Sequence, residues 1–365
     1  MRVGWLFVAV GLTIGACSTS ARTESVPSSS DHPTVPAGVA RPSTEAASAS
    51  ASNAGTDRPA VSAGTFSGSI MFMHQDAGQH WRIWIACEDL TRARLVSTKP
   101  GFDAGWSVFS PDGSRIAFNA NFADADPSAG PDIWDVYSMD RDGMDVRRLT
   151  HSTGLEGDPG YSPDGALIAY DSTEPGRHGI WVMDAADGGH PRLVTPDPAP
   201  GGVSYGPRFS PDGRRLLFTF SIGDFTPGAF DGSAWVVNVD GTDLRRITPA
   251  SIYPSKAEWS PDGTWIATDA ASDAYPFQTL WLVRPDGADV HRIEMPPTVT
   301  GDRDGFADVA WSPDGSMILA DHGVFDGGTR STVGLATIGM DGSGLSYLGD
   351  GSGDEHKPDW SEAGC

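Results

Sequence analysis

Three short runs of the sequence have residue types and spacing that can support chemistry. The run 202–206 reads Gly-Val-Ser-Tyr-Gly and matches G-x-S-x-G, the turn that exposes a nucleophilic serine in some hydrolases. The runs 140–145 and 302–308 carry aspartates at alternate positions, a spacing that calcium loops use. Acyl transfer by a serine and calcium binding are therefore the chemistries to test against the surrounding sequence.

The surroundings of these runs favour neither chemistry. A nucleophile elbow joins a strand to a helix, whereas the run 202–206 stands just before a Ser-Pro-Asp-Gly turn at 210–213. An EF-hand loop needs flanking helices and a closing glutamate, and the run 140–145 has the pattern of a hairpin turn. The nine histidines include no H-E-x-x-H pair. We therefore assign no catalytic residue, no metal ligand and no cofactor, with calcium at the two aspartate runs as the alternative.

The Ser-Pro-Asp-Gly turn indicates which elements position these residues, because it recurs about every 50 residues. A degenerate sixth copy begins at Ser361, and an aromatic residue precedes every copy. Proline presets φ at the second turn position, aspartate bonds the local backbone and glycine takes the left-handed position. The turn aspartates are thus structural. The serines of the five intact copies are Ser110, Ser162, Ser210, Ser260 and Ser312.

Each repeat continues in the same order after its turn. A short apolar run such as 168–170 comes first, then a second run such as 180–184, an Asp-Gly turn, and a third run such as 192–195. With the strand before the turn, each unit has four short strands, and sheets of that kind repeated at 40–50 residues are typical of β-propellers. The sequence predicts an all-β fold of six four-stranded blades over residues 66–365.

The repeat resembles the WD-like repeat of TolB-type propellers. The resemblance rests on the aromatic-Ser-Pro-Asp-Gly turn, on runs such as Ile-Ala-Tyr at 168–170 and Ile-Trp-Val-Met-Asp at 180–184, and on Arg-Arg-Leu-Thr at 147–150. It covers about 300 residues and implies a six-bladed propeller without implying a single activity. TolB proteins carry an α/β domain before the blades, a place that a polar segment takes here, so the resemblance does not extend to a Tol-Pal role.

The ring is expected to close through the C-terminal strand. The first repeat has strands at 69–72, 82–86 and 93–97 but no inner strand, and the last repeat ends with a spare strand at 357–360. The spare strand should complete the first blade, which removes two open sheet edges. Cys87 and Cys365 would then lie near each other, and in an exported protein we expect a disulfide between them; two free thiols are the alternative.

The N-terminus has the pattern of an export signal. Residues 4–16 are uncharged and too few to span a membrane as a helix, which needs roughly 20 residues. The run Ile14-Gly15-Ala16-Cys17 resembles a bacterial lipobox, which implies a signal peptide over 1–16 and lipid on Cys17. An ordinary secretory signal is the alternative. Residues 17–65 hold the lipidated cysteine and a Ser/Ala/Pro/Thr-rich linker that lacks the apolar side chains needed to fold.

Composition excludes two classes of protein. The formal net charge of −23 is the opposite of the basic footprint that a nucleic-acid-binding protein needs. The 45 glycines and 28 prolines among 365 residues favour turns over a helical bundle.

The connections that follow the second strand of each blade vary in length and sequence, and variable loops on a repeated scaffold usually carry the binding site. The starts of the inner strands should surround the mouth of the channel on the same face, where convergent polar groups are the default site. The candidate binding residues there are Trp106, Glu156, Asp158, Tyr205, Lys256, Asp308, Glu355 and His356.

These observations predict a monomeric, membrane-anchored lipoprotein exported to the periplasmic or cell-surface side. Its propeller is expected to bind an envelope protein, peptide or glycan, and no nucleic acid. The alternative is a polysaccharide lyase or hydrolase at the channel mouth, with Glu156 and either Asp308 or Glu355 as the paired carboxylates.

Overall fold

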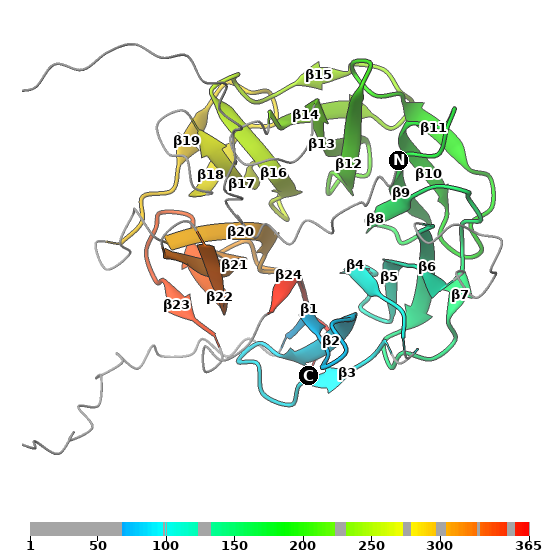
Figure 1. Cartoon of the computed structure of the whole chain (residues 1–365). Helices are drawn as coiled ribbons and strands as arrows, with labels where there is room; N and C mark the ends of the chain where they lie inside the picture. The colour runs from blue at the N-terminus through cyan, green and yellow to red at the C-terminus, as the bar shows by residue number, and fades with distance from the viewer. Residues whose placement is uncertain are drawn as a thin grey trace, which may run out of the picture. The chain divides into compact units, whose positions relative to one another are not determined.

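The computed structural model describes residues 68–97, 99, 101–122, 133–222, 231–272, 279–296, 304–326, 329–348 and 355–364. In this part the chain forms six antiparallel sheets of four strands each, set around a ring (Figure 1). The prediction of an all-β, six-bladed propeller is confirmed. The expected signal peptide at 1–16, Cys17, the linker 17–65 and Cys365 lie outside the described residues.

The blades follow one another along the chain, and each runs from an inner strand to an outer strand. Blade 1 is β24 (His356–Ser361), β1 (Ser69–Gln75), β2 (Trp81–Cys87) and β3 (Arg94–Leu95). Blade 2 is β4 (Ala104–Phe109), β5 (Arg115–Ala120), β6 (Asp135–Asp140) and β7 (Arg147–Arg148). Blade 3 is β8 (Glu156–Tyr161), β9 (Leu167–Ser172), β10 (Gly179–Asp184) and β11 (Arg192–Thr195).

The other three blades have the same order. Blade 4 is β12 (Gly202–Phe209), β13 (Arg215–Ile222), β14 (Ser233–Asn238) and β15 (Arg245–Arg246). Blade 5 is β16 (Ile252–Trp259), β17 (Ile266–Ser272), β18 (Thr279–Val283) and β19 (Val290–Arg292). Blade 6 is β20 (Asp304–Trp311), β21 (Met317–Asp326), β22 (Thr329–Gly339) and β23 (Ser346–Tyr347).

The C-terminal strand closes the ring as the sequence predicts. Strand β24 pairs antiparallel with β1, with Ile70 opposite Trp360 and Ser69 opposite Ser361. The last segment of the chain thereby supplies the inner strand of the first blade (Figure 1). The outer strands are short, several of them only two residues long, which limits the free edge that another chain could pair with.

The Ser-Pro-Asp-Gly turns have the structural role expected of them. In the first copy the Ser110 hydroxyl donates to the Asp112 carboxylate at 2.6 Å and accepts from the Arg115 amide at 2.9 Å. The hydrogen bond from Ser110, together with bonds from Ser114, lowers the pKa of Asp112 to about 2. Because the same bonds recur in the later copies, these aspartates serve as turn-forming groups.

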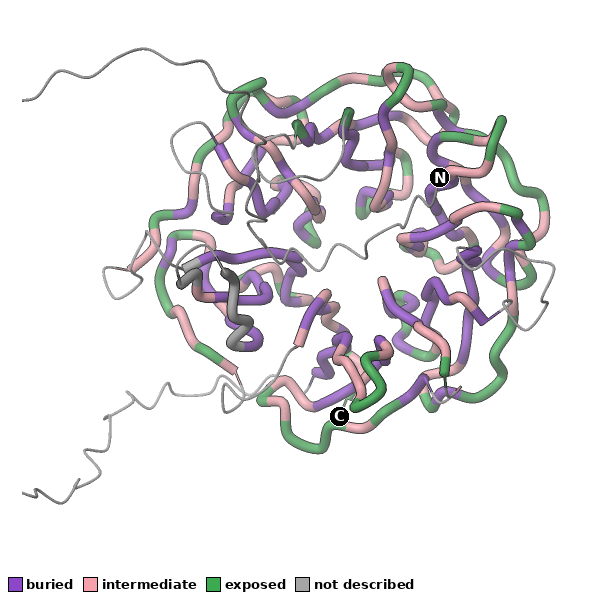
Figure 2. The backbone as a smooth tube through the Cα atoms, in the orientation of Figure 1, coloured by how far each residue is buried: buried purple, intermediate pink, exposed green. Residues whose placement is uncertain are grey.

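The hydrophobic core is divided into six clusters, one at each interface between neighbouring blades. Between blades 2 and 3, for example, Val136 and Leu149 pack with Ile168, Tyr170 and Met183. Buried residues follow the strands, and exposed residues collect toward the outer rim (Figure 2). Each blade is thus stabilised by burying both of its faces against neighbours.

The Asp-Gly turns also join the blades. Gly188 in blade 3 has a φ of 74°, and a Cβ built on it would lie 2.1 Å from the Leu149 carbonyl oxygen of blade 2. Gly342 in blade 6 makes the equivalent approach to Glu294 of blade 5. Glycine is therefore required both for the left-handed conformation and for the close contact.

Within the described ranges, the chain contains no helix with the length and hydropathy of a membrane span.

Candidate functional site

The inner strand of every blade contains a β-bulge, which changes the side chains that face the axis of the ring. The register of each inner strand against its neighbour shifts once. The bulge lies about three residues before the aromatic residue that precedes each turn serine. We call the six residues at this position the axial ring: Trp106, Asp158, Gly206, Lys256, Asp308 and Lys357.

Most of the axial ring has a left-handed backbone. The φ angles are 44° at Trp106, 46° at Asp158, 53° at Asp308 and 54° at Lys357, and Gly206 has a φ of 64°. For a residue with a Cβ this conformation costs roughly 1–2 kcal/mol. Four such residues at equivalent places in one ring are a concentration of strain, and strain of this kind collects at functional sites.

Charged residues of the axial ring contact each other across blades. The Lys357 ammonium of blade 1 lies 2.5 Å from the Asp308 carboxylate of blade 6 and 5.6 Å from the ring centre of Trp106 in blade 2. Asp158 of blade 3 interacts electrostatically with Lys357 and with Lys256 of blade 5. Side chains from five blades therefore act on one central region.

A second axial layer lies two residues further along each inner strand, toward the Ser-Pro-Asp-Gly turns. In this layer the Arg208 guanidinium pairs with Glu258 at 2.5 Å and donates to the carbonyl oxygens of Asp158 and Pro159 at 3.3 Å. The Asp359 carboxylate accepts a hydrogen bond from the Phe109 amide at 2.7 Å. The other residues at this position are Val108, Gly160 and Ala310, of which Val108 and Ala310 pack in the hydrophobic clusters between blades.

Burial perturbs the acids around the axis. It raises the pKa of Asp359 to about 6 and that of Asp269 to about 7, and it also raises the pKa values of Asp158 and Asp171. The pKa of Lys357 is also raised, because the Asp308 carboxylate favours the charged ammonium more than burial disfavours it. Of these acids, Asp359 and Asp269 therefore titrate close to neutral pH.

The structure brings half of the predicted mouth residues together. Trp106, Asp158, Lys256 and Asp308 are all members of the axial ring. Tyr205 is next to Gly206, and burial together with Asp269 raises the pKa of its hydroxyl. These residues can present charged, hydrogen-bonding and aromatic groups to one polar ligand.

Three other predicted mouth residues have different surroundings. His356 is buried and hydrogen-bonds through Nδ1 to Asp321 at 2.9 Å, with its ring edge-on to Trp81. Glu355 is half-buried beside Gly334. Glu156 is buried away from the axis, at the interface of blades 2 and 3, where Arg177 lies 3.8 Å from its carboxylate.

Two of the three runs singled out in the sequence have structural surroundings, and the third begins at Asp302, outside the described residues. Ser204 of the G-x-S-x-G run is fully buried in β12, and its amide donates to Asp197. The Asp140 carboxylate accepts from the amides of Asp142 and Met144, as in a hairpin turn. In the described part of the chain, no three His, Cys, Asp or Glu side chains are grouped as metal ligands.

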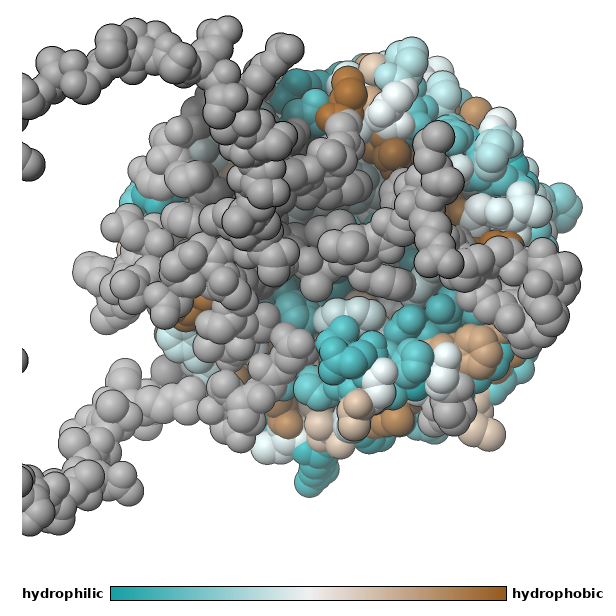
Figure 3. Space-filling view, in the orientation of Figure 1, coloured by the Kyte–Doolittle hydropathy of each residue, from teal (hydrophilic) through white to brown (hydrophobic). Residues whose placement is uncertain are grey.

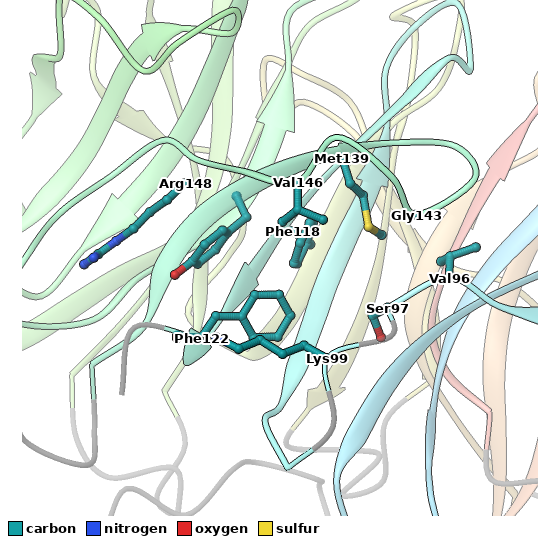
Figure 4. A pocket seen from close by; sticks show the side chains of 10 residues that line it. Val96, Ser97, Lys99, Phe118, Phe122, Met139, Gly143, Val146 and Arg148 are labelled. Atoms are coloured by element: carbon teal, nitrogen blue, oxygen red, sulfur yellow. Dashed lines mark hydrogen bonds between the residues drawn. The ribbon is translucent and has the colours of Figure 1, made fainter. Parts of the chain in front are cut away.

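A cavity of about 390 Å³ lies away from the axis, between the outer part of blade 1 and blade 2 (Figure 4). Phe118, Phe122, Tyr137 and Met139 line it, and the Lys99 ammonium lies 4.9 Å from the ring centre of Phe122. Phe118 is 0% exposed and Met139 1%. The cavity is therefore a narrow crevice in the packing of two blades.

In the view of Figure 3, hydrophilic residues predominate on the described surface and apolar residues form separate patches.

Comparisons with known proteins agree with this architecture. The chain is 31% identical over 218 residues to an uncharacterized protein of Agrobacterium fabrum, a match that covers 58% of this chain and 69% of that one. It is 29% identical over 130 residues to the Tol-Pal system protein TolB of Anaeromyxobacter dehalogenans. That match covers 36% of this chain and 27% of the TolB chain.

Solved structures show the same fold. The crystal structure of TolB from Acinetobacter baumannii superimposes with a TM-score of 0.62 at 19% identity, over 82% of this chain and 67% of that one. No family model matches the sequence.

Proposed function

Because the chain belongs to the TolB-like six-bladed β-propellers, we propose that it is an envelope binding protein. Its propeller binds a partner protein, peptide or glycan at the mouth of the axis. The partner contacts the axial ring and the neighbouring variable loops, and no bond in it is broken.

One observation carries this proposal: four residues of the axial ring other than glycine keep a left-handed backbone at equivalent positions. A ring that served only to close the propeller could use glycine at each bulge, as blade 4 does with Gly206. Tryptophan, aspartate and lysine instead supply groups that bind ligands. Trp106 is partly buried and the Lys256 side chain is 17% exposed, so part of the ring is accessible to a ligand.

We also propose that the propeller is tethered to a membrane through lipid on Cys17. The lipobox-like run 14–17 and the polar segment that follows it support this anchor. The named TolB relative is a Tol-Pal system protein, which supports a partner in the cell envelope. Substitution Cys17→Ser should move the protein from the membrane fraction to the soluble fraction, and retention in the membrane fraction would contradict the anchor.

Site-specific photo-cross-linking in cells tests the binding surface. A photoreactive amino acid replaces Tyr205 beside the axial ring, and in a matched control it replaces Thr264, an exposed residue of a Ser-Pro-Asp-Gly turn at the other end of an inner strand. We expect one partner to be enriched from position 205 and not from position 264. Equal capture at both positions, or none at position 205 with both variants folded, would overturn the proposal for a protein partner.

A second candidate function is hydrolysis or elimination of a polysaccharide at the mouth. The pKa of Asp269, raised to about 7, favours it because a carboxyl group that keeps its proton near neutral pH can act as a general acid, and burial shifts the pKa of Asp158 in the same direction. Turnover of envelope polysaccharides that disappears in Asp158→Asn would establish this function. Saturable glycan binding without turnover would support the binding protein.

A further inference from the structure

A second cluster of charged side chains lies away from the axis, where blade 2 meets blade 3. Asp135 begins β6 and Glu156 begins β8, and both side chains are at most 2% exposed. The Glu156 amide donates to the Trp134 carbonyl oxygen at 2.8 Å, which holds the beginnings of these two strands together. Two acids are therefore buried at one interface between blades.

Asp135 is well provided with partners. Arg148 lies 2.6 Å from one of its oxygens, and the other oxygen accepts hydrogen bonds from the Thr150 hydroxyl and the Ser152 amide, both at 3.1 Å. The Thr150 hydroxyl has one proton, which it donates to Asp135, while it accepts from the Val136 amide. Thr150 thus has no proton left to donate to Glu156.

Glu156 has fewer hydrogen-bond and ion-pair partners than Asp135. Its Oε1 atom is buried without a hydrogen-bond partner, and the nearest guanidinium nitrogen of Arg177 is 3.8 Å away. Arg177 lies closer to Glu174, at 3.4 Å, and donates to the Tyr170 hydroxyl at 3.3 Å. Its guanidinium also lies 4.2 Å from the ring centre of Trp181. The cation that Glu156 would need as a carboxylate is therefore engaged elsewhere.

This geometry suits a protonated Glu156. An ionised carboxylate that is buried without a donor is costly. A protonated Glu156 can instead donate its proton in a hydrogen bond to the oxygen of the Thr150 hydroxyl. Burial raises the pKa of Glu156 to about 7 although the Thr150 hydroxyl and Arg177 act to lower it, and the nearby Asp135 and Glu174 carboxylates add to the rise. Ionisation would favour a different position of Arg177, close enough to pair with Glu156.

We propose that Glu156 and Arg177 form a proton-operated latch between blades 2 and 3. When Glu156 carries a proton, Arg177 stays with Glu174 and Tyr170. When Glu156 releases that proton to solvent, Arg177 closes onto the carboxylate and draws the segment 173–178, between β9 and β10, toward the interface. This segment is one of the variable connections, so the latch changes the shape of the proposed binding face.

Several other charged groups face this latch or adjoin it. Arg148 and Asp135 come from blade 2, and Glu174 and Arg177 come from the segment itself. The imidazole of His178, the residue after Arg177, lies 3.5 Å from Asp197, and His151 follows Thr150 on the surface. Because histidine changes charge in the same range of pH, both histidines need a control.

Hydrogen exchange of the intact protein, without any partner, tests the latch. Exchange of the peptide 173–180, corrected for the intrinsic effect of pH, is followed from pH 5.5 to 8.5. We expect increased protection above a midpoint near pH 7, and Glu156→Gln should abolish this transition. Arg177→Gln should also abolish the transition because no cation is left to close onto Glu156, and Glu174→Gln should lower its midpoint because it removes a like charge and releases Arg177.

Three results would overturn the latch: a wild-type profile without a transition, an unchanged transition in Glu156→Gln, or loss of the transition when His151 and His178 are both replaced by glutamine. If Glu156→Gln does not fold, the loss of the transition in Arg177→Gln and its lower midpoint in Glu174→Gln still decide the question, because both side chains are partly exposed. The measurement involves no ligand, so its failure is independent of the proposed binding function.

Discussion

Lys357 and Asp308 form an ion pair across the seam at which the ring closes. Lys357 belongs to β24, the last strand of the chain, and Asp308 belongs to β20 of blade 6. The two side chains are 22% and 9% exposed. The pair therefore joins the closing strand to the preceding blade while it forms part of the axial ring.

Removing only the cation of this pair should be costly. In Lys357→Met the Asp308 carboxylate stays buried without its partner, and breaking a buried pair in this way costs about 3–5 kcal/mol. We expect an effect toward the lower end, because the lysine is partly exposed. Urea unfolding monitored by circular dichroism measures the loss. The double variant Lys357→Met/Asp308→Leu should recover part of it, and a single variant as stable as the wild type would show that the pair does not hold the seam.

The Asp-Gly turns offer a test of the contacts between blades. Gly188→Ala should destabilise the protein by several kcal/mol, because the new Cβ would lie 2.1 Å from the Leu149 carbonyl oxygen at a φ of 74°. Gly176→Ala is the matched control, since its φ is 85° and no atom lies within 4 Å of a Cβ there. The control should show only the conformational cost of about 1–2 kcal/mol. Equal shifts in urea midpoint would mean that blade 2 moves aside at no cost.

The buried acids predict how stability depends on pH. Burial raises the pKa of Asp359 to about 6 and that of Asp269 to about 7, whereas an unfolded aspartate titrates near 3.9. The folded state thus holds these protons more tightly, and the stability they contribute is fully present below about pH 4 and is lost as the pH rises through 6 to 7. The free energy of unfolding should be lower at pH 8 than at pH 5.

A variant assigns this pH dependence to one group. The Lys256 amide donates to the Asp269 carboxylate at 3.1 Å, and the side-chain oxygen of Asp269→Asn can still accept this hydrogen bond. The amide nitrogen of the new side chain can hydrogen-bond to the Ser255 hydroxyl, which now contacts the carboxylate. This variant should reduce the difference in stability between pH 5 and pH 8, whereas the exposed Glu294→Gln should leave it unchanged. A protein equally stable at both pH values would contradict the raised pKa values.

The repeat determines how far the sequence could predict the fold. The turn signals at Ser110 and its counterparts specify each blade, and the spare strand at 357–360 predicts the closure that β24 provides. Chain order and turn chemistry are local properties, so they can be read without coordinates.

The candidate site was predictable only in part, because the inner strands are bulged. Strict alternation assigns side chains to two faces, but one extra residue reverses that assignment beyond the bulge. Counting back from the aromatic residue still finds Trp106 and Asp308, which lie at the bulge. It does not find the pairing of Arg208 with Glu258, and it assigns Glu156 to the axis although that side chain is buried between blades.

The first blade also has a covalent restraint, and its second cysteine can be predicted. Cys87 is disulfide-bonded. Ser69 lies opposite Cys87 in the sheet, and its hydroxyl donates to the Ala363 carbonyl oxygen at 3.1 Å. Ala363 therefore lies near Cys87, and because Cys365 follows it by two residues we expect Cys365 to be the partner.

Alkylation without reduction, followed by intact mass measurement, tests this pairing. Cys365→Ser should make Cys87 reactive and should lower the free energy of unfolding by about 2–4 kcal/mol, because it opens a long covalent loop. Cys17→Ser should leave Cys87 unreactive. The reverse pattern, with Cys87 freed by Cys17→Ser and protected in Cys365→Ser, would assign the bond to the other end of the chain and would also exclude lipid on Cys17, since one sulfur cannot serve both purposes.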